Sequence, residues 1–167
     1  MRKMTEKNLR DAFSGESQAS MKYLNFSMQA EKEGFPGVAK LFKAISFAER
    51  VHASNHLKAL GDLKKTVENL QTAIDGETFE VEEMYPSYDA VANLQNESEA
   101  KKSIHYAVEA EKLHAKIYMD AKSQVAEGKD FDVKNVYICK VCGYTALNNA
   151  PHKCPVCGAS FDFFETF

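Results

Sequence analysis

The chain has 167 residues, a formal net charge of −3 and 44% hydrophobic residues. This length suffices for one domain with a sizeable core, or for that domain and a small second one. Lysine and arginine are scattered among the acidic residues, which argues against a nucleic-acid or membrane surface, and neither a secretory signal nor a membrane-spanning run is found. We therefore expect a cytoplasmic protein.

Two antiparallel helices are expected first, at residues 5–33 and at about 36–60. A glycine- and proline-containing break separates them, and so short a connection makes the helices neighbours. Gly61 is the expected cap of the second helix. Glu16 lies 17 residues before the end of one helix and Glu49 lies 13 residues after the start of the other. At about 1.5 Å per residue, the two glutamates should be level to within about one turn.

A six-residue pattern, Ala-Glu-[Arg/Lys]-[Val/Leu]-His-Ala, occurs at 48–53 and again at 110–115. Residues three apart lie on one helix face, so each copy directs a glutamate and a histidine the same way, on the apolar stripe of its helix. One copy alone would most simply be an ion-paired core histidine. Two copies favour a shared metal site, because di-iron carboxylate bundles use Glu-x-x-His on two helices. The paired residues are Glu49 with His52 and Glu111 with His114.

Residues 62–76 are interpreted as a crossover that contains a short helix, followed by the third helix of the bundle. That helix carries Glu77, Glu80 and Glu83 at three-residue spacing, so geometry alone does not choose among them. Pro86 lies within the same helical pattern. Because proline removes a backbone hydrogen bond, we expect a bend next to the acidic residues.

The fourth helix is expected at 97–127, after which the pattern changes. We expect two domains, a helical one at 1–132 and a small strand- and turn-rich one at 133–167 that starts with a strand at 133–139. All four cysteines lie in the second, in two Cys-x-x-Cys knuckles: Cys139, Cys142, Cys154 and Cys157. Paired knuckles of this kind bind one zinc or iron ion through four thiolates, and a reducing cytosol disfavours disulfides.

Several carboxylates project inward on this interpretation, and no lysine or arginine lies on their stripes. Two metal ions carry four positive charges if ferrous and six if ferric, which brackets five carboxylates, and oxygen and imidazole ligands suit iron or manganese. His56 is more simply a core or outer histidine than a ligand. The inward-facing set is Glu16, Glu49, Glu80, Glu83 and Glu111 with His52 and His114.

Together these motifs resemble the rubrerythrin family, a mainly α fold in which a ferritin-like di-iron four-helix bundle precedes a rubredoxin-like domain. The resemblance rests on Gly-Glu-Ser-Gln-Ala at 15–19, on both Glu-x-x-His copies, and on Glu-x-x-Glu-Met-Tyr-Pro at 80–86. It also rests on Cys-x-x-Cys-Gly-Tyr with Cys-Pro-x-Cys-Gly. The motifs span nearly the whole chain in the family's order.

The resemblance implies roles for individual residues. From the third helix it implies Glu80 and Glu83 as ligands, rather than Glu77. It favours iron over zinc in the four-cysteine site. The other implied roles are bridging carboxylates at Glu49 and Glu111, terminal ligands at Glu16 and His114, a ligand that alternates between Glu83 and His52 with oxidation state, and nearby tyrosines at Tyr23 and Tyr88.

The activity implied by the resemblance is a non-haem di-iron peroxidase that reduces hydrogen peroxide to water in oxidative-stress defence. Electrons would pass through the four-cysteine iron from an electron-donor protein or an NAD(P)H-dependent reductase. We expect one chain's two metal sites to lie too far apart for fast transfer. A homodimer or higher homo-oligomer, with domain swapping as one form, would then bring one subunit's four-cysteine iron near the other's di-iron site.

Two alternatives stay open at this point. One is a ferroxidase or iron-handling protein, which shares the bundle but needs no redox-active iron after it. The other is a zinc-binding module with the helices as a scaffold. The Phe-rich segment at 161–164 is a candidate docking surface in each case.

Overall fold

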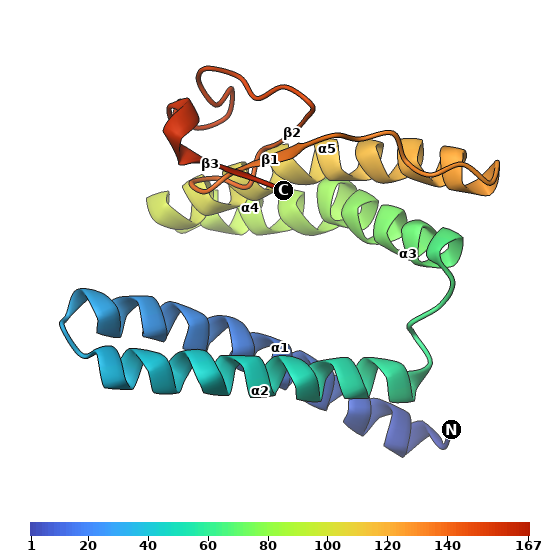
Figure 1. Cartoon of the computed structure of the whole chain (residues 1–167), viewed down its shortest axis with the longest axis horizontal. Helices are drawn as coiled ribbons and strands as arrows, with labels where there is room; N and C mark the ends of the chain where they lie inside the picture. The colour runs from blue at the N-terminus through green and yellow to red at the C-terminus, as the bar shows by residue number, and fades with distance from the viewer. The chain divides into compact units, whose positions relative to one another are not determined.

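The computed structural model describes all of residues 1–167 and consists of two compact units, residues 1–64 and 65–167. The first unit is an antiparallel hairpin of two helices, α1 (Lys3–Lys32) and α2 (Pro36–Leu60) (Figure 1). The helices predicted at 5–33 and 36–60 are therefore confirmed. Gly61 has a φ of 73° and caps α2 in the left-handed conformation, as predicted.

Small side chains hold α1 and α2 together. The hydroxyls of Ser20 and Ser46 each donate to the other residue's carbonyl oxygen, at 2.9 and 2.7 Å, and the Ser27 hydroxyl donates to the carbonyl of Ala39 at 2.8 Å. Large apolar residues of the predicted stripe stay outside this interface: Leu41 is 58% exposed and Ile45 39%. The hairpin thus leaves unburied an apolar face that was predicted to be core.

The second unit contains α3 (Thr66–Phe79), the π-helix η1 (Glu80–Met84), α4 (Tyr85–Leu94) and α5 (Ser98–Ala126). The first three elements follow one another without a break and pack against α5 (Figure 1). The fourth predicted helix is confirmed as α5.

The helix predicted within 62–76 is present as α3, but the predicted bounds of the crossover are wrong. Only residues 62–65 connect α2 to α3, and α3 runs through Gly76. A glycine inside a helix costs about 1 kcal/mol relative to alanine, which is a weak signal for a helix end. The packing of α3 on α5 outweighs it.

The disturbance predicted next to Pro86 takes the form of a π-helix. The backbone N–H of Tyr85 donates to the carbonyl of Glu80, five residues earlier, instead of to the residue four earlier. In a regular α-helix the proline ring would clash with the carbonyl of Glu82. The wider π-turn directly before α4 inserts one extra residue into the helix at this point.

The rest of the second unit is a three-stranded antiparallel sheet in the order β2-β1-β3. Its strands are β1 (Val136–Cys139), β2 (Thr145–Leu147) and β3 (Phe164–Thr166), and a short 3₁₀ turn, η2 (Phe161–Phe163), precedes β3. The strand predicted at 133–139 is confirmed over its second half, and the mainly α fold with a small cysteine-bearing end is confirmed. The domain boundary between 132 and 133 stays a prediction. No helix combines the length and the apolar character that crossing a membrane requires.

Candidate metal centres

The first acidic cluster lies in the α1–α2 hairpin and consists of Glu16, Glu49 and His52; we call it half-site 1. The Nδ1 atom of His52 lies 2.9 Å from Oε2 of Glu49 and 4.0 Å from Oε1 of Glu16. The carboxylates of the two helices therefore stand level, as their positions relative to the turn predicted. The His52 side chain is 55% exposed.

The second acidic cluster lies in the second unit and consists of Glu77 of α3 with Glu111 and His114 of α5; we call it half-site 2. The Nδ1 atom of His114 lies 2.6 Å from Oε2 of Glu111 and 4.0 Å from Oε1 of Glu77. The His114 side chain is only 27% exposed. Both half-sites thus place one imidazole nitrogen against the glutamate of its own helix and a second glutamate from a neighbouring helix.

The spacing along the chain differs by one residue between the half-sites. Glu16 and Glu49 are 33 residues apart, whereas Glu77 and Glu111 are 34 apart. The π-helix η1 lies between Glu77 and Glu111 and accommodates one extra residue in its wider turn. Without this one inserted residue, the two glutamates of half-site 2 would have the same separation along the chain as the two glutamates of half-site 1.

The third-helix residues are arranged differently from the pattern that the resemblance implied. Glu77, which that pattern set aside, joins Glu111 and His114, whereas Glu83 is exposed and belongs to neither cluster. The wide turn of η1 changes the angular position of the residues that follow Glu80 compared with an α-helix. Glu83 as a ligand remains a prediction, and Glu77 is the glutamate that the spacing left open and the resemblance set aside.

Glu80 lies at the edge of half-site 2. Burial raises the pKa of Glu80, the negative charge of Glu111 raises it further, and His114 opposes the change. Burial also raises the pKa of Glu77 to about 7, with contributions from a hydrogen bond to Glu111 and from the charges of Glu111 and Glu80. Without a cation, Glu77 is therefore about half protonated at pH 7.

The predicted tyrosines have different surroundings. Tyr23 is half-buried between α1 and α2, where its ring contacts those of Phe26 and Phe42. Tyr88 is 53% exposed and meets the Tyr85 ring edge-on, with the ring centroids 6.2 Å apart. Tyr85 is the residue close to the acidic cluster, because burial and then the charges of Glu80, Glu111 and Glu77 raise its pKa. Sequence reasoning missed Tyr85, although it sits within the 80–86 motif.

Each half-site fits one divalent cation. It offers one imidazole and two carboxylates, and a divalent ion would neutralise the two negative charges. Carboxylate and imidazole ligands suit iron, manganese or zinc rather than a metal that requires soft ligands. His56 is half-buried on α2 and lies outside both clusters, while His105 and His152 are exposed.

The four cysteines form one cluster around a common centre. The Sγ atoms of Cys139 and Cys157 are 3.6 Å apart and those of Cys142 and Cys154 3.4 Å apart. These separations far exceed a disulfide bond of about 2.05 Å and approach the roughly 3.8 Å edge of a tetrahedron with metal–sulfur bonds of about 2.3 Å. The cluster therefore fits a single tetrahedrally bound metal ion.

The protein environment shifts the pKa values of these thiols in different directions. Burial raises the pKa of Cys142. Burial acts in the same direction on Cys154, but the backbone N–H groups of Cys157 and Val156 and the neighbouring thiols lower its pKa to about 7. Cys154 is thus the thiol most easily ionised, and a metal ion would favour the thiolate form of all four.

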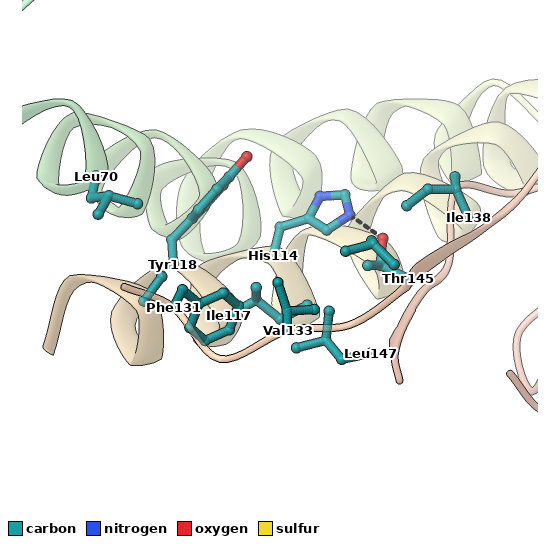
Figure 2. Close-up of a pocket in the computed structure, with 11 residues that line it drawn as sticks. Leu70, His114, Ile117, Tyr118, Phe131, Val133, Ile138, Thr145 and Leu147 are labelled. Atoms are coloured by element: carbon teal, nitrogen blue, oxygen red, sulfur yellow. Dashed lines mark hydrogen bonds between the residues drawn. The ribbon is translucent and has the colours of Figure 1, made fainter. Parts of the chain in front are cut away.

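The four-cysteine end contacts half-site 2 within the same chain. The Nε2 atom of His114 lies 2.8 Å from the hydroxyl of Thr145 in β2, three residues after Cys142 (Figure 2). Sequence reasoning did not find this contact, because the two residues are 31 positions apart. This contact brings the cysteine-bearing end next to His114, while the expectation that one chain's two metal sites lie too far apart for fast transfer stays a prediction.

Comparison with known proteins gives two family matches. The sequence profile of the rubrerythrin family matches residues 7–122, and that of the rubrerythrin rubredoxin-like domain matches residues 137–165. The first contains both half-sites, and the second contains all four cysteines.

Individual relatives match over nearly the whole chain. The chain is 42% identical to Rubrerythrin-2 of Clostridium acetobutylicum, covering 98% of this chain and 97% of the relative. It is 34% identical to a rubrerythrin of Nitratidesulfovibrio vulgaris, covering 96% and 93%. Among solved structures, the fully reduced, all-ferrous state of nigerythrin is 27% identical with a TM-score of 0.58, covering 98% of this chain and 86% of that one.

Proposed function

The chain belongs to the rubrerythrin family, and we propose that it is a non-haem di-iron peroxidase. It would reduce hydrogen peroxide to two water molecules with two protons and two electrons. The observation that carries the proposal is the repeated half-site: His52 and His114 hold the same relation to two glutamates each, with matching 4.0 Å distances to the more distant one. We propose that one half-site of each kind combines into a binuclear centre.

Iron is the proposed metal in both kinds of site. The all-ferrous state named for nigerythrin supports iron in a related protein, and the four-thiolate cluster accepts iron as readily as zinc. Two ferrous ions in the carboxylate site would act as Lewis acids toward both peroxide oxygens and supply the two electrons. A reducing cytoplasm is the proposed setting, consistent with four free thiols.

The chain's own residues would bind and orient the metal ions and manage protons. Glu49 and Glu111, each next to its histidine on one helix, are the proposed bridging carboxylates, and Glu16 and Glu77 the proposed outer ones. A proton held at Glu77 in the metal-free protein would leave when a cation binds, because a cation favours the ionised carboxylate. Glu80 is the proposed additional carboxylate of the site.

Electrons would enter through the four-cysteine iron, supplied by an electron-donor protein or an NAD(P)H-dependent reductase. The hydrogen bond between Thr145 and His114 supports this route for the electrons, since it joins the cysteine-bearing end to a proposed iron ligand.

A homo-oligomer is also part of the proposal, and it offers one way to cover the apolar face of the α1–α2 hairpin. The α1–α2 hairpin exposes large apolar side chains, including Leu41, Ile45 and Phe47, which two helices alone do not bury. A second pair of helices would cover them, as in other four-helix bundles. That pair could come from the same chain or, in a domain-swapped dimer, from its partner.

The proposal is tested by anaerobic titration of the reduced, iron-loaded protein with hydrogen peroxide, while the visible absorption of the ferric four-cysteine centre is followed. We expect rapid reoxidation of that centre in the wild type. Glu49→Ala and Glu111→Ala should each slow it by more than about 100-fold, since even outer residues of metal sites contribute 10- to 100-fold. Glu82→Ala, on the exposed side of η1, is the matched control.

Two other outcomes would reject the peroxidase. If peroxide leaves the four-cysteine centre reduced while dioxygen oxidises added ferrous iron, the protein handles iron instead. If neither oxidant acts and the protein purified under iron-replete, zinc-free conditions still excludes iron from both sites, a zinc-binding scaffold is the better description.

A further inference from the structure

Thr145 connects half-site 2 to the cysteine knuckle through two hydrogen bonds. Its Oγ1 lies 2.8 Å from Nε2 of His114 and 3.2 Å from the carbonyl oxygen of Gly143, the residue directly after Cys142. Gly143 has a φ of 80°, and a Cβ built on it would lie 3.8 Å from the Cβ of Ala110. The knuckle therefore rests on α5 at the residue that precedes Glu111.

The contacts of Thr145 favour one arrangement of hydrogens on His114. A carbonyl oxygen can only accept, so Thr145 satisfies Gly143 by donating its single hydroxyl hydrogen to it. Oγ1 then accepts from His114, which carries hydrogen on Nε2 in this arrangement. The 2.6 Å contact of Nδ1 with Glu111 adds a hydrogen on Nδ1 in the metal-free protein, and a bound metal ion would take its place. The nitrogen that faces Glu77 and Glu111 is Nδ1. With Nε2 occupied in this way, Nδ1 is the nitrogen that can offer a lone pair to a metal ion.

The surroundings of this contact are mostly apolar. Thr145 is 7% exposed, and it lines a cavity of about 320 Å³ together with His114. Figure 2 shows the imidazole reaching toward Thr145 among apolar side chains, which include Ile117, Ile138 and Leu147. In such surroundings a hydrogen bond is stronger than in water, and an unpaired N–H would be costly.

His52 provides the contrast within the same chain. Its Nδ1 faces Glu49 and Glu16 as that of His114 faces Glu111 and Glu77, but its Nε2 has no hydrogen-bond partner within the α1–α2 hairpin. The ring is also twice as exposed, 55% against 27%. Of the two histidines, only His114 has a hydrogen bond at Nε2, the nitrogen that points away from the glutamates.

We propose that Thr145 is a positioning residue, which holds His114 with Nε2 protonated and Nδ1 directed at the metal. The proposal rests on the proposed metal-binding function of half-site 2. It makes His114 the imidazole that is held at both ring nitrogens, whereas the α1–α2 hairpin holds His52 at Nδ1 alone. It also makes metal binding at half-site 2 depend on correct docking of the cysteine knuckle, because the hydroxyl that orients His114 is itself oriented by Gly143.

The test compares Thr145→Val, which keeps the shape and loses the hydroxyl, with Thr145→Ser, which keeps the hydroxyl. Zinc-loaded protein labelled with ¹⁵N-histidine is used, because zinc is redox-inert and the assay needs no turnover. In Thr145→Val we expect solvent exchange of the His114 Nε2 proton to be about tenfold faster. We expect zinc affinity of the carboxylate site to be about 10- to 100-fold weaker. Thr145→Ser should resemble the wild type in both.

The controls separate hydroxyl from packing and this proposal from the preceding one. Thr72→Val removes a hydroxyl from an exposed position on α3 and should change neither measurement. Wild-type behaviour of Thr145→Val would overturn the proposal, and so would a Thr145→Ser protein that behaves like the valine variant. If the wild type shows no peroxide reduction while zinc affinity still depends on the hydroxyl, the peroxidase fails and the positioning role stands.

Discussion

The two half-sites have the same set of side chains, two glutamates and a histidine, but different surroundings. In half-site 1, Glu16, Glu49 and His52 project from a bare pair of helices joined through small residues. Half-site 2 has a matching set, yet it adds a π-helix, a third nearby glutamate and a hydrogen bond from behind its histidine. Half-site 1 consists of side chains from two helices alone, whereas half-site 2 also contacts the π-helix η1 and the cysteine-bearing end of the chain.

This difference shows where a repeated motif can acquire separate tasks. The ligands alone do not distinguish the two histidines, since each Nδ1 lies within hydrogen-bonding distance of the glutamate three residues before it. The contacts at Nε2 do distinguish them. Thr145 bonds to Nε2 of His114, whereas Nε2 of His52 has no partner within its hairpin. An asymmetric metal centre can therefore arise from symmetric ligands.

The largest expected effect separates the two ways of pairing the half-sites. Glu49→Ala and Glu111→Ala damage different half-sites, and each alone should abolish metal binding at the binuclear centre. Co-expression with two affinity tags would yield mixed dimers. In a domain-swapped dimer, one of the two centres receives both intact half-sites, so about half of the wild-type iron content and peroxide-dependent oxidation should return.

The matched control is a mixed dimer that carries Glu49→Ala in both chains with two different tags. It should remain inactive, since no pairing of its half-sites is intact. Recovery of activity only in the Glu49→Ala and Glu111→Ala pair would demonstrate exchange of hairpins. A stable mixed dimer with no recovery would mean that each chain completes its own centre.

A second prediction concerns the third helix, where the half-sites differ most. Glu77→Ala should lower metal affinity more than about 100-fold, because the carboxylate lies within the cluster and loss of outer residues alone costs 10- to 100-fold. Glu83→Ala should stay within about twofold of the wild type, as Glu83 is exposed outside it. Calorimetric titration of the metal-free variants with zinc measures both.

The two variants act as controls for each other, since both remove a glutamate side chain from neighbouring turns of one helical rod. A strong loss in Glu83→Ala with little change in Glu77→Ala would restore the ligand set that the family resemblance implied. It would also mean that η1 rearranges when metal binds, because Glu83 would have to turn inward.

Local chemistry explains which parts of this structure could be predicted from the sequence. The breaks at Gly34 and Gly61 were recognisable because both residues adopt positive φ, which glycine tolerates. The two Glu-x-x-His copies predicted the helix faces of both half-sites, because i and i+3 positions share a face in any α-helix. The cysteine spacing predicted the four-thiolate cluster for a similarly local reason.

The sequence-based predictions failed where the local structure depends on contacts between residues distant in the sequence. Gly76 was interpreted as an end of the crossover, although packing on α5 carries the helix through it. Equal three-residue spacing hid the change of helix type at Glu80, so the choice between Glu77 and Glu83 could not be made locally. The bond between His114 and Thr145 spans 31 positions and depends on how the knuckle docks.

The smallest expected effect uses the proton that half-site 2 holds without metal. Folding raises the pKa of Glu77 from 4.5 to about 7, chiefly through burial. The stabilisation from the protonated carboxyl is therefore complete below about pH 4.5 and is lost as the pH rises through about 7. The free energy of unfolding of the metal-free protein should fall over this range, by at most about 1.4 kcal/mol per pH unit.

Glu77→Gln isolates this contribution, because glutamine keeps the shape and hydrogen bonding of the protonated acid and cannot ionise. Urea unfolding of metal-free protein between pH 4.5 and 7.5 should show the variant gaining stability relative to the wild type as the pH rises. Glu82→Gln, exposed on η1, should run parallel to the wild type. Added zinc should reverse the wild-type trend, since a metal ion takes the place of the proton and binds more tightly at higher pH. Parallel curves for Glu77→Gln and the wild type would show that Glu77 is ionised without metal and that half-site 2 resembles half-site 1 more closely than its surroundings indicate.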